Sequence, residues 1–321
     1  MILGGDIGGT KTHLALFERS EELPMLRDKK YPSRDYKDLQ SIINEFLAAG
    51  KERITAAVFA VPGPVADGRC HTTNLPWVID ALEISRAMKV EKVFLLNDLE
   101  ANAWGILHLK PEEFCTINSG DSTQKGNAAL IAAGTGLGEA GLYWDGQKLH
   151  PFPCEGGHVD FAPRDENESS LLHFLQKQFG HVSYERVLSG PGLYNIYRFL
   201  IESGQEKENP LIRQEMQDRD PPKVITEAAM KKKCKACLHA LNWFVSIYGA
   251  EAGNLALKML SLSGVYIGGG IAPNILPLLK TGAFLKSFIA KGRFEPLLKT
   301  IPIKVILNEN ATLLGAVYYT R

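Results

Sequence analysis

Residues 2–17 read ILGGDIGGTKTHLALF, and this stretch decides the fold. Two apolar runs flank the pair Gly8-Gly9, a pattern that predicts a β-hairpin with a glycine turn. Glycine lets backbone N–H groups approach a ligand closely, so such a turn can bind phosphate oxygens. Asp6 and Thr10 stand at the two ends of the turn. We therefore predict that a nucleotide contacts Asp6, Gly8, Gly9 and Thr10.

Two more glycine-rich segments follow apolar strands in the same way, near residues 134 and 268. One such loop is usually only a turn, but three in the same context favour a nucleotide site. The predicted contacts in these loops are Gly134, Thr135, Gly136, Gly268, Gly269 and Gly270.

Two common nucleotide-binding motifs do not fit these loops. Residues 136–141 match the dinucleotide fingerprint, but that fingerprint must open a helix, and residues 142–144 read as a strand before an Asp145-Gly146 turn. The first hairpin approaches a P-loop, but Thr10 stands where the second glycine is needed. Neither a Rossmann domain nor a P-loop domain is expected.

Strand and helix patterns alternate along the rest of the chain. Apolar residues at helical spacing predict a helix from Leu39 to Leu47, and residues 55–61 read as a buried strand. A long helix is expected from Lys223 to Leu262, with kinks at Gly249 and Gly253. The chain is therefore expected to be an α/β protein with buried, mixed sheets.

Composition narrows the classes of function. Lys+Arg and Asp+Glu each number 36, so there is no basic surplus for nucleic acid or for an anionic membrane surface. No apolar run approaches the roughly 20 residues that span a bilayer, and no signal peptide opens the sequence, so a cytoplasmic protein is expected. Cys234 and Cys237, expected inside the long helix, are interpreted as reduced thiols rather than as a redox or zinc pair.

Asn97-Asp98 follows the short apolar strand 93–96 and precedes a helix. Asp98 could simply cap that helix. If the predicted nucleotide donates a phosphoryl group, however, a carboxylate must accept the proton of the attacking hydroxyl, and a strand end presents one rigidly. The helix N-terminus favours the ionised form of Asp98, and the amide of Asn97 can both donate to and accept from a vicinal diol.

The sequence Glu155-Gly156-Gly157-His158 places an acid and an imidazole three residues apart. This motif could be a zinc half-site, but residues 159–163 contain no cysteine, so no structural zinc is predicted. Glu155, His158 and the later Glu185 are then available to bind sugar hydroxyls. A hexose is uncharged and rich in hydroxyl groups, so a site with many hydrogen-bond acceptors suits it.

The three loops resemble the hexokinase-like branch of the actin-like ATPase superfamily. Over nearly the whole length the chain resembles the zinc-free bacterial glucokinase family, most specifically at residues 154–163, at residues 185–192 and at Asn97-Asp98. The resemblance implies two actin-like (ribonuclease H-like) α/β domains with an interdomain cleft. It implies a small domain of residues 1–109 plus 300–321, a large domain of residues 110–299, and a homodimer formed through the large domain.

The resemblance also implies the chemistry: transfer of the γ-phosphoryl group of ATP to the 6-hydroxyl of glucose, with Asp98 as base. Glucose would contact Asn97, Asp98, Glu155, His158 and Glu185. Asp6 would position Mg²⁺, directly or through water, and Thr10 and Thr135 would bond phosphate oxygens. Cys154 departs from the family, which commonly has glycine there, and this leaves the KM for glucose open.

Three other functions remain open at this stage. A kinase for mannose, fructose or N-acetylmannosamine would differ by only one or two hydroxyl contacts. A sugar-sensing regulator would carry a helix-turn-helix ahead of the hairpin, where only five residues precede Asp6. An actin-like chaperone would lack the Asn-Asp and Glu-Gly-Gly-His acceptors.

Overall fold

The computed structural model describes residues 1–72 and 74–321. The chain divides into two compact units. The first consists of Met1–Pro111, His150–Pro153 and Asn308–Arg321, and the second of Glu112–Leu149 and Cys154–Leu307.

A five-stranded mixed sheet forms the centre of the first unit, with the strand order β3-β2-β1-β4-β8. Its strands are β1 (Ile2–Ile7), β2 (Lys11–Phe17), β3 (Met25–Pro32), β4 (Ala56–Val61) and β8 (Lys92–Asn97). The predicted hairpin is confirmed, because β1 and β2 pair antiparallel from Ile2↔Phe17 to Ile7↔Thr12. Strands β1, β4 and β8 run parallel, so their carboxyl ends share one edge. A small sheet contains β5 (Val65–Ala66), β6 (Arg69–His71) and β7 (Val78–Asp80).

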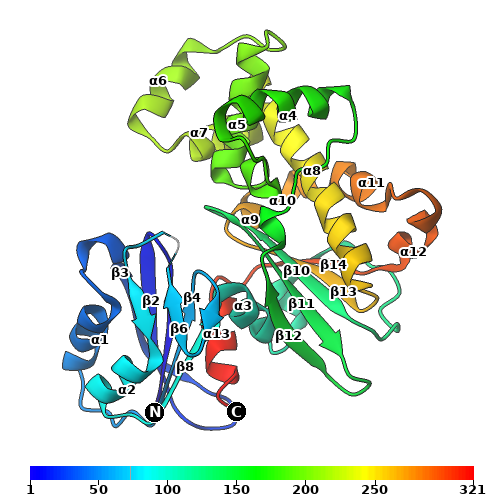
Figure 1. The fold of residues 1–321 in the computed structure, drawn as a ribbon. Coiled ribbons are helices and arrows are strands. Elements are labelled where there is room, and N and C mark those ends of the chain that lie inside the picture. Colours follow the sequence, from blue (N-terminus) through cyan, green and yellow to red (C-terminus); the bar gives the residue numbers. More distant parts are fainter. Residues whose placement is uncertain (73) are drawn as a thin grey trace. The chain divides into compact units, whose positions relative to one another are not determined.

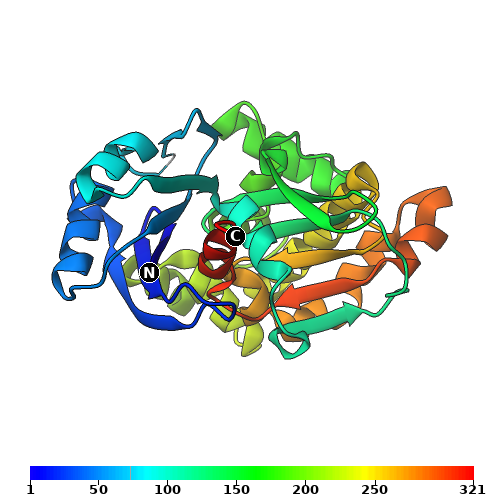
Figure 2. The ribbon, with the colours of Figure 1, turned by 90° about the horizontal axis from the view of Figure 1, so that it is seen from below.

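Helices cover both faces of this five-stranded sheet (Figures 1 and 2). Alternate residues of β4 enter opposite cores: Phe59 packs with α1 (Leu39–Ala48) and α2 (Ala81–Met88), whereas Val58 packs with α3 (Asp98–Ile106) and α13 (Ala311–Tyr318). The period-two alternation of a strand thus buries both of its faces. Helix α13, from the end of the chain, lies against α3 so closely that a Cβ on Gly105 would be 2.0 Å from Ala311 O.

The second unit is built on a six-stranded sheet with the order β12-β11-β10-β13-β14-β9, although residues 150–153 of the edge strand β12 are grouped with the first unit. Its strands are β9 (Phe114–Asn118), β10 (Ala128–Ala133), β11 (Leu137–Trp144), β12 (Leu149–Cys154), β13 (Gly264–Gly268) and β14 (Ile303–Ile306). Strands β10 and β11 form a second antiparallel hairpin, and β10, β13 and β14 run parallel. Residues 142–144 continue strand β11, as predicted, so the dinucleotide fingerprint opens no helix.

Helices pack on this sheet around one continuous core. They are α4 (Glu166–Phe179), α5 (Gly190–Glu202), α6 (Pro210–Asp218), α7 (Pro221–Met230), α8 (Lys235–Met259), α9 (Ile271–Asn274), α10 (Leu276–Leu279), α11 (Ala283–Ile289) and α12 (Glu295–Thr300). Short 3₁₀ turns lie at η1 (Ser33–Asp35), η2 (Pro111–Glu113), η3 (Gly156–His158), η4 (Tyr184–Arg186) and η5 (Gly292–Phe294). Two of these turns, η3 and η4, carry candidate site residues.

The prediction of a single helix from Lys223 to Leu262 is wrong. This part of the chain forms two helices, α7 and α8, which are separated by a turn in which Lys232 has a left-handed φ of 53°. Cys234 caps α8, its sulfur accepting the Cys237 N–H at 3.3 Å, so the two cysteines begin a helix rather than lying inside one. Both thiols are free and buried.

Helix α8 continues through Gly249 and Gly253, and the kinks expected at these two residues remain a prediction. A Cβ on Gly249 would lie 2.1 Å from Phe284 O, and one on Gly253 would lie 2.4 Å from Phe288 O. These two glycines therefore let the backbone of α11 approach α8 closely.

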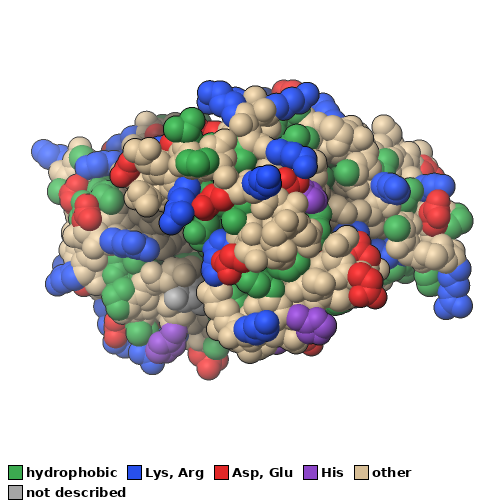
Figure 3. All heavy atoms as spheres, turned by 90° about the horizontal axis from the view of Figure 1, so that it is seen from above, with side chains coloured by type: hydrophobic (Ala, Val, Ile, Leu, Met, Phe, Trp, Pro, Cys, Tyr) green, Lys and Arg blue, Asp and Glu red, His purple; other side chains and the backbone are tan. Residues whose placement is uncertain are grey.

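The charge pattern of the surface agrees with the composition. On the face in Figure 3, acidic and basic side chains are interspersed. Within the described residues, no helix combines the length and apolar character needed to cross a membrane.

Candidate active site

The β1–β2 loop holds the first group of predicted nucleotide contacts. Gly8 N–H donates to Lys11 O at 2.9 Å, which closes the turn after Asp6. The buried Ser33, at the start of η1, braces the turn: its hydroxyl donates to Gly8 O at 2.7 Å and its N–H donates to Thr10 O at 3.1 Å. Thr10 is exposed, so its hydroxyl can contact a ligand.

Asp6 is the last residue but one of strand β1, and its side chain is partly buried. Burial raises the pKa of its carboxyl group, and the nearby His13 and Lys11 oppose this rise. His13 is already paired, with its Nε2 at 2.7 Å from Asp28 Oδ2. A carboxylate held in this way is suited to a cation that enters the loop.

Asn97 and Asp98 join β8 to α3. Asn97, only 6% exposed, is the helix cap: its Oδ1 accepts Leu99 N–H at 3.0 Å, and its Nδ2 donates to Gly63 O at 3.2 Å. Because Asn97 caps α3, the simple capping explanation of Asp98 loses force, although Asp98 Oδ1 also accepts Leu99 N–H at 2.9 Å. Burial, followed by the charge of Asp98, raises the pKa of Cys70 to about 11, so this thiol stays protonated near Asp98.

The strand register brings Asp6 and Asn97 to one edge of the sheet. Asp6 pairs with Ala60 on β4, and the next residue, Val61, pairs with Asn97 on β8. Two strand spacings separate β1 from β8, or about 10 Å. The first unit therefore presents the phosphate loop and Asn97-Asp98 side by side along its carboxyl edge.

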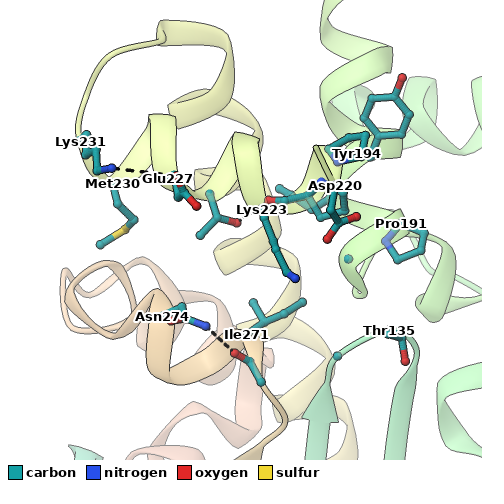
Figure 4. A pocket seen from close by; sticks show the side chains of 17 residues that line it. Thr135, Pro191, Tyr194, Asp220, Lys223, Glu227, Met230, Lys231, Ile271 and Asn274 are labelled. Atoms are coloured by element: carbon teal, nitrogen blue, oxygen red, sulfur yellow. Dashed lines mark hydrogen bonds and ion pairs between the residues drawn. The ribbon is translucent and has the colours of Figure 1, made fainter. Parts of the chain in front are cut away.

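The second unit contains a cavity of about 820 Å³ (Figure 4). It is lined by the loop residues Gly134 and Thr135 of the β10–β11 hairpin and by Gly270 after β13. Its walls are formed by Gly190, Pro191, Leu193, Tyr194, Asp220, Pro221, Pro222, Lys223, Thr226, Glu227, Met230, Lys231, Ile271 and Asn274. The structure thus brings two of the three glycine loops to one cavity.

Charge within this cavity is unevenly arranged. The Lys231 ammonium lies 4.0 Å from Glu227 Oε2, whereas Lys223, on the first turn of α7, projects its ammonium into the open space (Figure 4). Ile271 and Met230 supply apolar surface nearby. A ligand with an apolar planar part and an anionic part would match this lining.

The remaining predicted loop glycines, Gly136, Gly268 and Gly269, lie beside the cavity but are not part of its lining. Gly269 has a φ of 81°, and a Cβ there would lie 2.2 Å from Ala133 O. Its role is to let β13 turn tightly against the end of β10.

His158 and Glu185 lie on the short turns η3 and η4 of the second unit, and Glu155 directly precedes η3 as its N-cap residue. Glu155 and His158 are exposed, and their side chains approach to 3.8 Å between Oε2 and Nε2. Glu185 is half-buried, and its Oε2 accepts Leu137 N–H at 3.0 Å. Tyr184 N–H donates to Val159 O at 3.0 Å, which ties the two turns together.

The first residues of β11 support both turns. Leu137 holds Glu185 through its N–H, and its carbonyl oxygen lies directly against Gly157, where a Cβ would be 2.0 Å away. Gly157 can occupy this position only because it has no side chain.

Comparison with known proteins decides the family. The profile described as Glucokinase matches residues 3–321. The chain belongs to the glucokinase family.

Sequence relatives and solved structures agree with this assignment. A glucokinase of Nostoc sp. (strain PCC 7120 / SAG 25.82 / UTEX 2576) is 40% identical over 98% of this chain and 97% of its own length. The structure of a glucokinase from an Antarctic psychrotroph has a TM-score of 0.83 at 30% identity, covering 99% of this chain and 98% of its own. A ROK family glucokinase from Streptomyces griseus, in complex with glucose and AMPPNP, has a TM-score of 0.67 at 22% identity, covering 98% and 97%, and shows the shared fold. The expected actin-like α/β class is confirmed.

For this glucokinase-family chain, Gly157→Ala should lower kcat/KM for glucose about a hundredfold, because a misplacement of about 1 Å at a binding group has an effect of that size. The added methyl group would displace the turn that carries Glu155 and His158, since Leu137 O leaves it no room. Steady-state kinetics would measure the change. Gly50→Ala is the matched control, because the methyl group there meets only the end of the Glu52 side chain. Equal kcat/KM for the two variants would refute the prediction.

Two residues of the candidate site escaped the sequence analysis. Ser33 lies 23 positions after Thr10, and nothing in its surroundings in the sequence indicates a contact with the loop. Lys223 follows Pro221-Pro222, which indicates a helix start but not a cavity. In both cases the contact depends on how distant segments pack.

Proposed function

We propose that the protein is a glucokinase that transfers the γ-phosphoryl group of Mg-ATP to the 6-hydroxyl of D-glucose, giving glucose 6-phosphate and ADP. The observation that carries this proposal is the carboxyl edge of the first unit, where Asp6 with its glycine loop and Asn97-Asp98 lie two strands apart in a chain of the glucokinase family.

The second-unit cavity is the proposed site of the adenosine part of ATP. Its apolar surface suits a purine, and Thr135 and the Lys223 ammonium, which line the same cavity, would contact phosphate oxygens. Gly134, Gly136, Gly268, Gly269 and Gly270 would shape the loops, and Gly8, Gly9 and Thr10 would contact the terminal phosphates. The Streptomyces griseus neighbour, whose structure holds AMPPNP, supports this use of the fold.

Asp6 is the proposed Mg²⁺ residue. Its partly buried carboxyl group, already flanked by Lys11 and His13, fits a cation held directly or through water. The ion would neutralise charge on the transferring phosphoryl group. Among the described residues, no three His, Cys, Asp or Glu side chains gather in a way that would hold a metal by themselves, so one carboxylate plus phosphate oxygens is the expected arrangement.

Asp98 is the proposed general base. It accepts the proton of the glucose 6-hydroxyl as that oxygen bonds to the γ-phosphorus and the bond from phosphorus to the ADP oxygen breaks. Asn97, Glu155, His158 and Glu185 are the proposed partners of the other glucose hydroxyls. The second amide hydrogen of Asn97 and the exposed groups of Glu155 and His158 give them the capacity to do so.

A cytoplasmic enzyme without nucleic-acid or membrane partners is proposed, supported by the equal numbers of acidic and basic residues. The homodimer formed through the large domain and the division at residues 109 and 300 rest on the family resemblance and remain predictions. The absence of structural zinc likewise remains a prediction, supported by the lack of cysteine after His158.

A coupled assay of ADP release with Mg-ATP and a panel of hexoses tests the proposal. We expect glucose to give the highest kcat/KM, with mannose, fructose and N-acetylmannosamine well below it. A faster reaction with one of those sugars would make the protein another hexose kinase. If no sugar stimulates ADP release, the kinase function is refuted.

A further inference from the structure

Glu139, on β11, is a buried acid that the proposed chemistry does not use. It is 1% exposed, no N–H or hydroxyl group among the described residues donates to either carboxyl oxygen, and its side chain is within hydrogen-bonding reach of the Glu251 carboxyl group. A buried carboxylate that receives no N–H or hydroxyl donor and faces a second acid is strongly unfavourable, so such a group tends to hold its proton.

This carboxyl group lies directly beneath the turn that carries Glu155 and His158. A Cβ on Gly156 would be 1.9 Å from Glu139 Oε2 and 2.8 Å from its Cδ. The turn η3 therefore rests on the Glu139 carboxyl group at Gly156, just as it rests on Leu137 O at Gly157.

Glu139 lies beside Glu251 of α8, and other ionisable groups surround this pair of acids. They are Lys258 and Tyr248 of α8, Cys154 of β12, Tyr184 of η4, and Lys291 before η5. Of the two acids, Glu251 is the one with partners, because Lys258 Nζ donates to it at 3.0 Å and Asn254 Nδ2 at 2.7 Å. These partners stabilise the charge on Glu251, and the proton belongs on Glu139.

We propose that Glu139 is a positioning residue for the sugar site: its neutral carboxyl group supports the η3 turn, and loss of its proton displaces Glu155 and His158. This inference rests on the proposed roles of Glu155 and His158 in binding glucose. The displacement follows because an ionised Glu139 repels Glu251 and draws in water, and the turn packs on it with no spare space.

The acid–base behaviour of the site agrees with this role. Burial, followed by the charge of Glu251, raises the pKa of Glu139 to about 8. The group is therefore neutral below pH 8 and ionises above it, so the support of the turn is present at neutral pH and is lost as the pH rises.

Glucose KM and kcat, measured from pH 6.5 to 9.5 with saturating Mg-ATP, test the proposal on the wild type, Glu139→Gln and Cys154→Ser. The wild-type KM should rise by up to about fivefold between pH 8 and 9, since the neutral fraction of a group with a pKa of about 8 falls from about one half to about one eleventh over that interval. In Glu139→Gln, which stays neutral, the KM should remain flat while kcat follows the wild type. Cys154→Ser should keep the wild-type rise, because it removes a different ionisable group close to Glu139 and leaves Glu139 itself in place.

An equal alkaline rise in wild type and Glu139→Gln would overturn the proposal, as would a flat wild-type profile. If Glu139→Gln fails to fold, Glu139→Leu provides a second non-ionising side chain with the same expected flat profile. Hydrogen exchange of amides 155–159, corrected for the intrinsic effect of pH, should show the turn loosening at pH 9 only in the wild type. If no sugar is phosphorylated, the proposed function fails, and this exchange experiment still decides the role of Glu139.

Discussion

Asp98→Asn is expected to lower kcat about a hundred- to ten-thousandfold, the range typical for loss of a general base. Asparagine has nearly the same shape and can still accept the Leu99 N–H through its amide oxygen, but it cannot take a proton from the sugar hydroxyl. Glucose binding, measured by titration calorimetry, should therefore change only a fewfold. The effect should appear in kcat rather than in KM.

Asp38→Asn is the matched control for this variant. Asp38 also accepts a backbone N–H at a helix start, from Ser41 at 2.8 Å, and belongs to the same unit. Its replacement should leave kcat unchanged. A kcat for Asp98→Asn close to that of the control would remove Asp98 from the chemistry, whatever the substrate.

Asp6→Asn is expected to lower kcat by about a hundred- to a thousandfold at fixed Mg²⁺, comparable to loss of one group that stabilises transition-state charge. The neutral amide cannot neutralise a divalent ion, whereas the fold should tolerate it well, because burial already disfavours the charged carboxylate. Thermal melting with ADP should separate these effects. The variant should match or exceed the wild-type Tm without ligand, and Mg²⁺ should add little stabilisation in the presence of ADP.

Asp28→Asn provides the comparison for Asp6→Asn. Asp28 pairs with His13, which faces Asp6, so this variant alters the same charge environment without touching the loop. It should keep its Mg²⁺ response. If Asp6→Asn also keeps a full Mg²⁺ response, Asp6 does not hold the ion.

The parts of the fold that depend on local sequence patterns could be predicted from the sequence. The β1–β2 hairpin follows from two apolar runs around Gly8-Gly9, and the helix near Leu39 follows from its apolar spacing. The same is true of the strand that leads into Asn97. These predictions succeeded because strand and helix periods are written in neighbouring residues.

The features that were missed depend on contacts between distant segments. The break between α7 and α8 was hidden because lysine and alanine favour helix and cysteine is an unusual cap, so nothing near Lys232 indicated a left-handed residue. The close approach of α11 to Gly249 and Gly253 could not be predicted from the sequence, because it forms only when α11 packs against α8. In the sequence, Glu139 is only one residue of the dinucleotide motif that does not fit, and its burial could not be predicted because η3 and α8 create it.

The bracing of the first loop by Ser33 determines how that loop meets an anion. A peptide group is planar and trans, so its C=O and N–H point in opposite directions. By holding Gly8 O and Thr10 O, Ser33 turns two carbonyl dipoles toward itself and fixes the opposite direction for the N–H groups of Gly9 and Lys11. The loop is therefore preorganised: its peptide groups are oriented before any phosphate arrives, and binding does not require them to rotate.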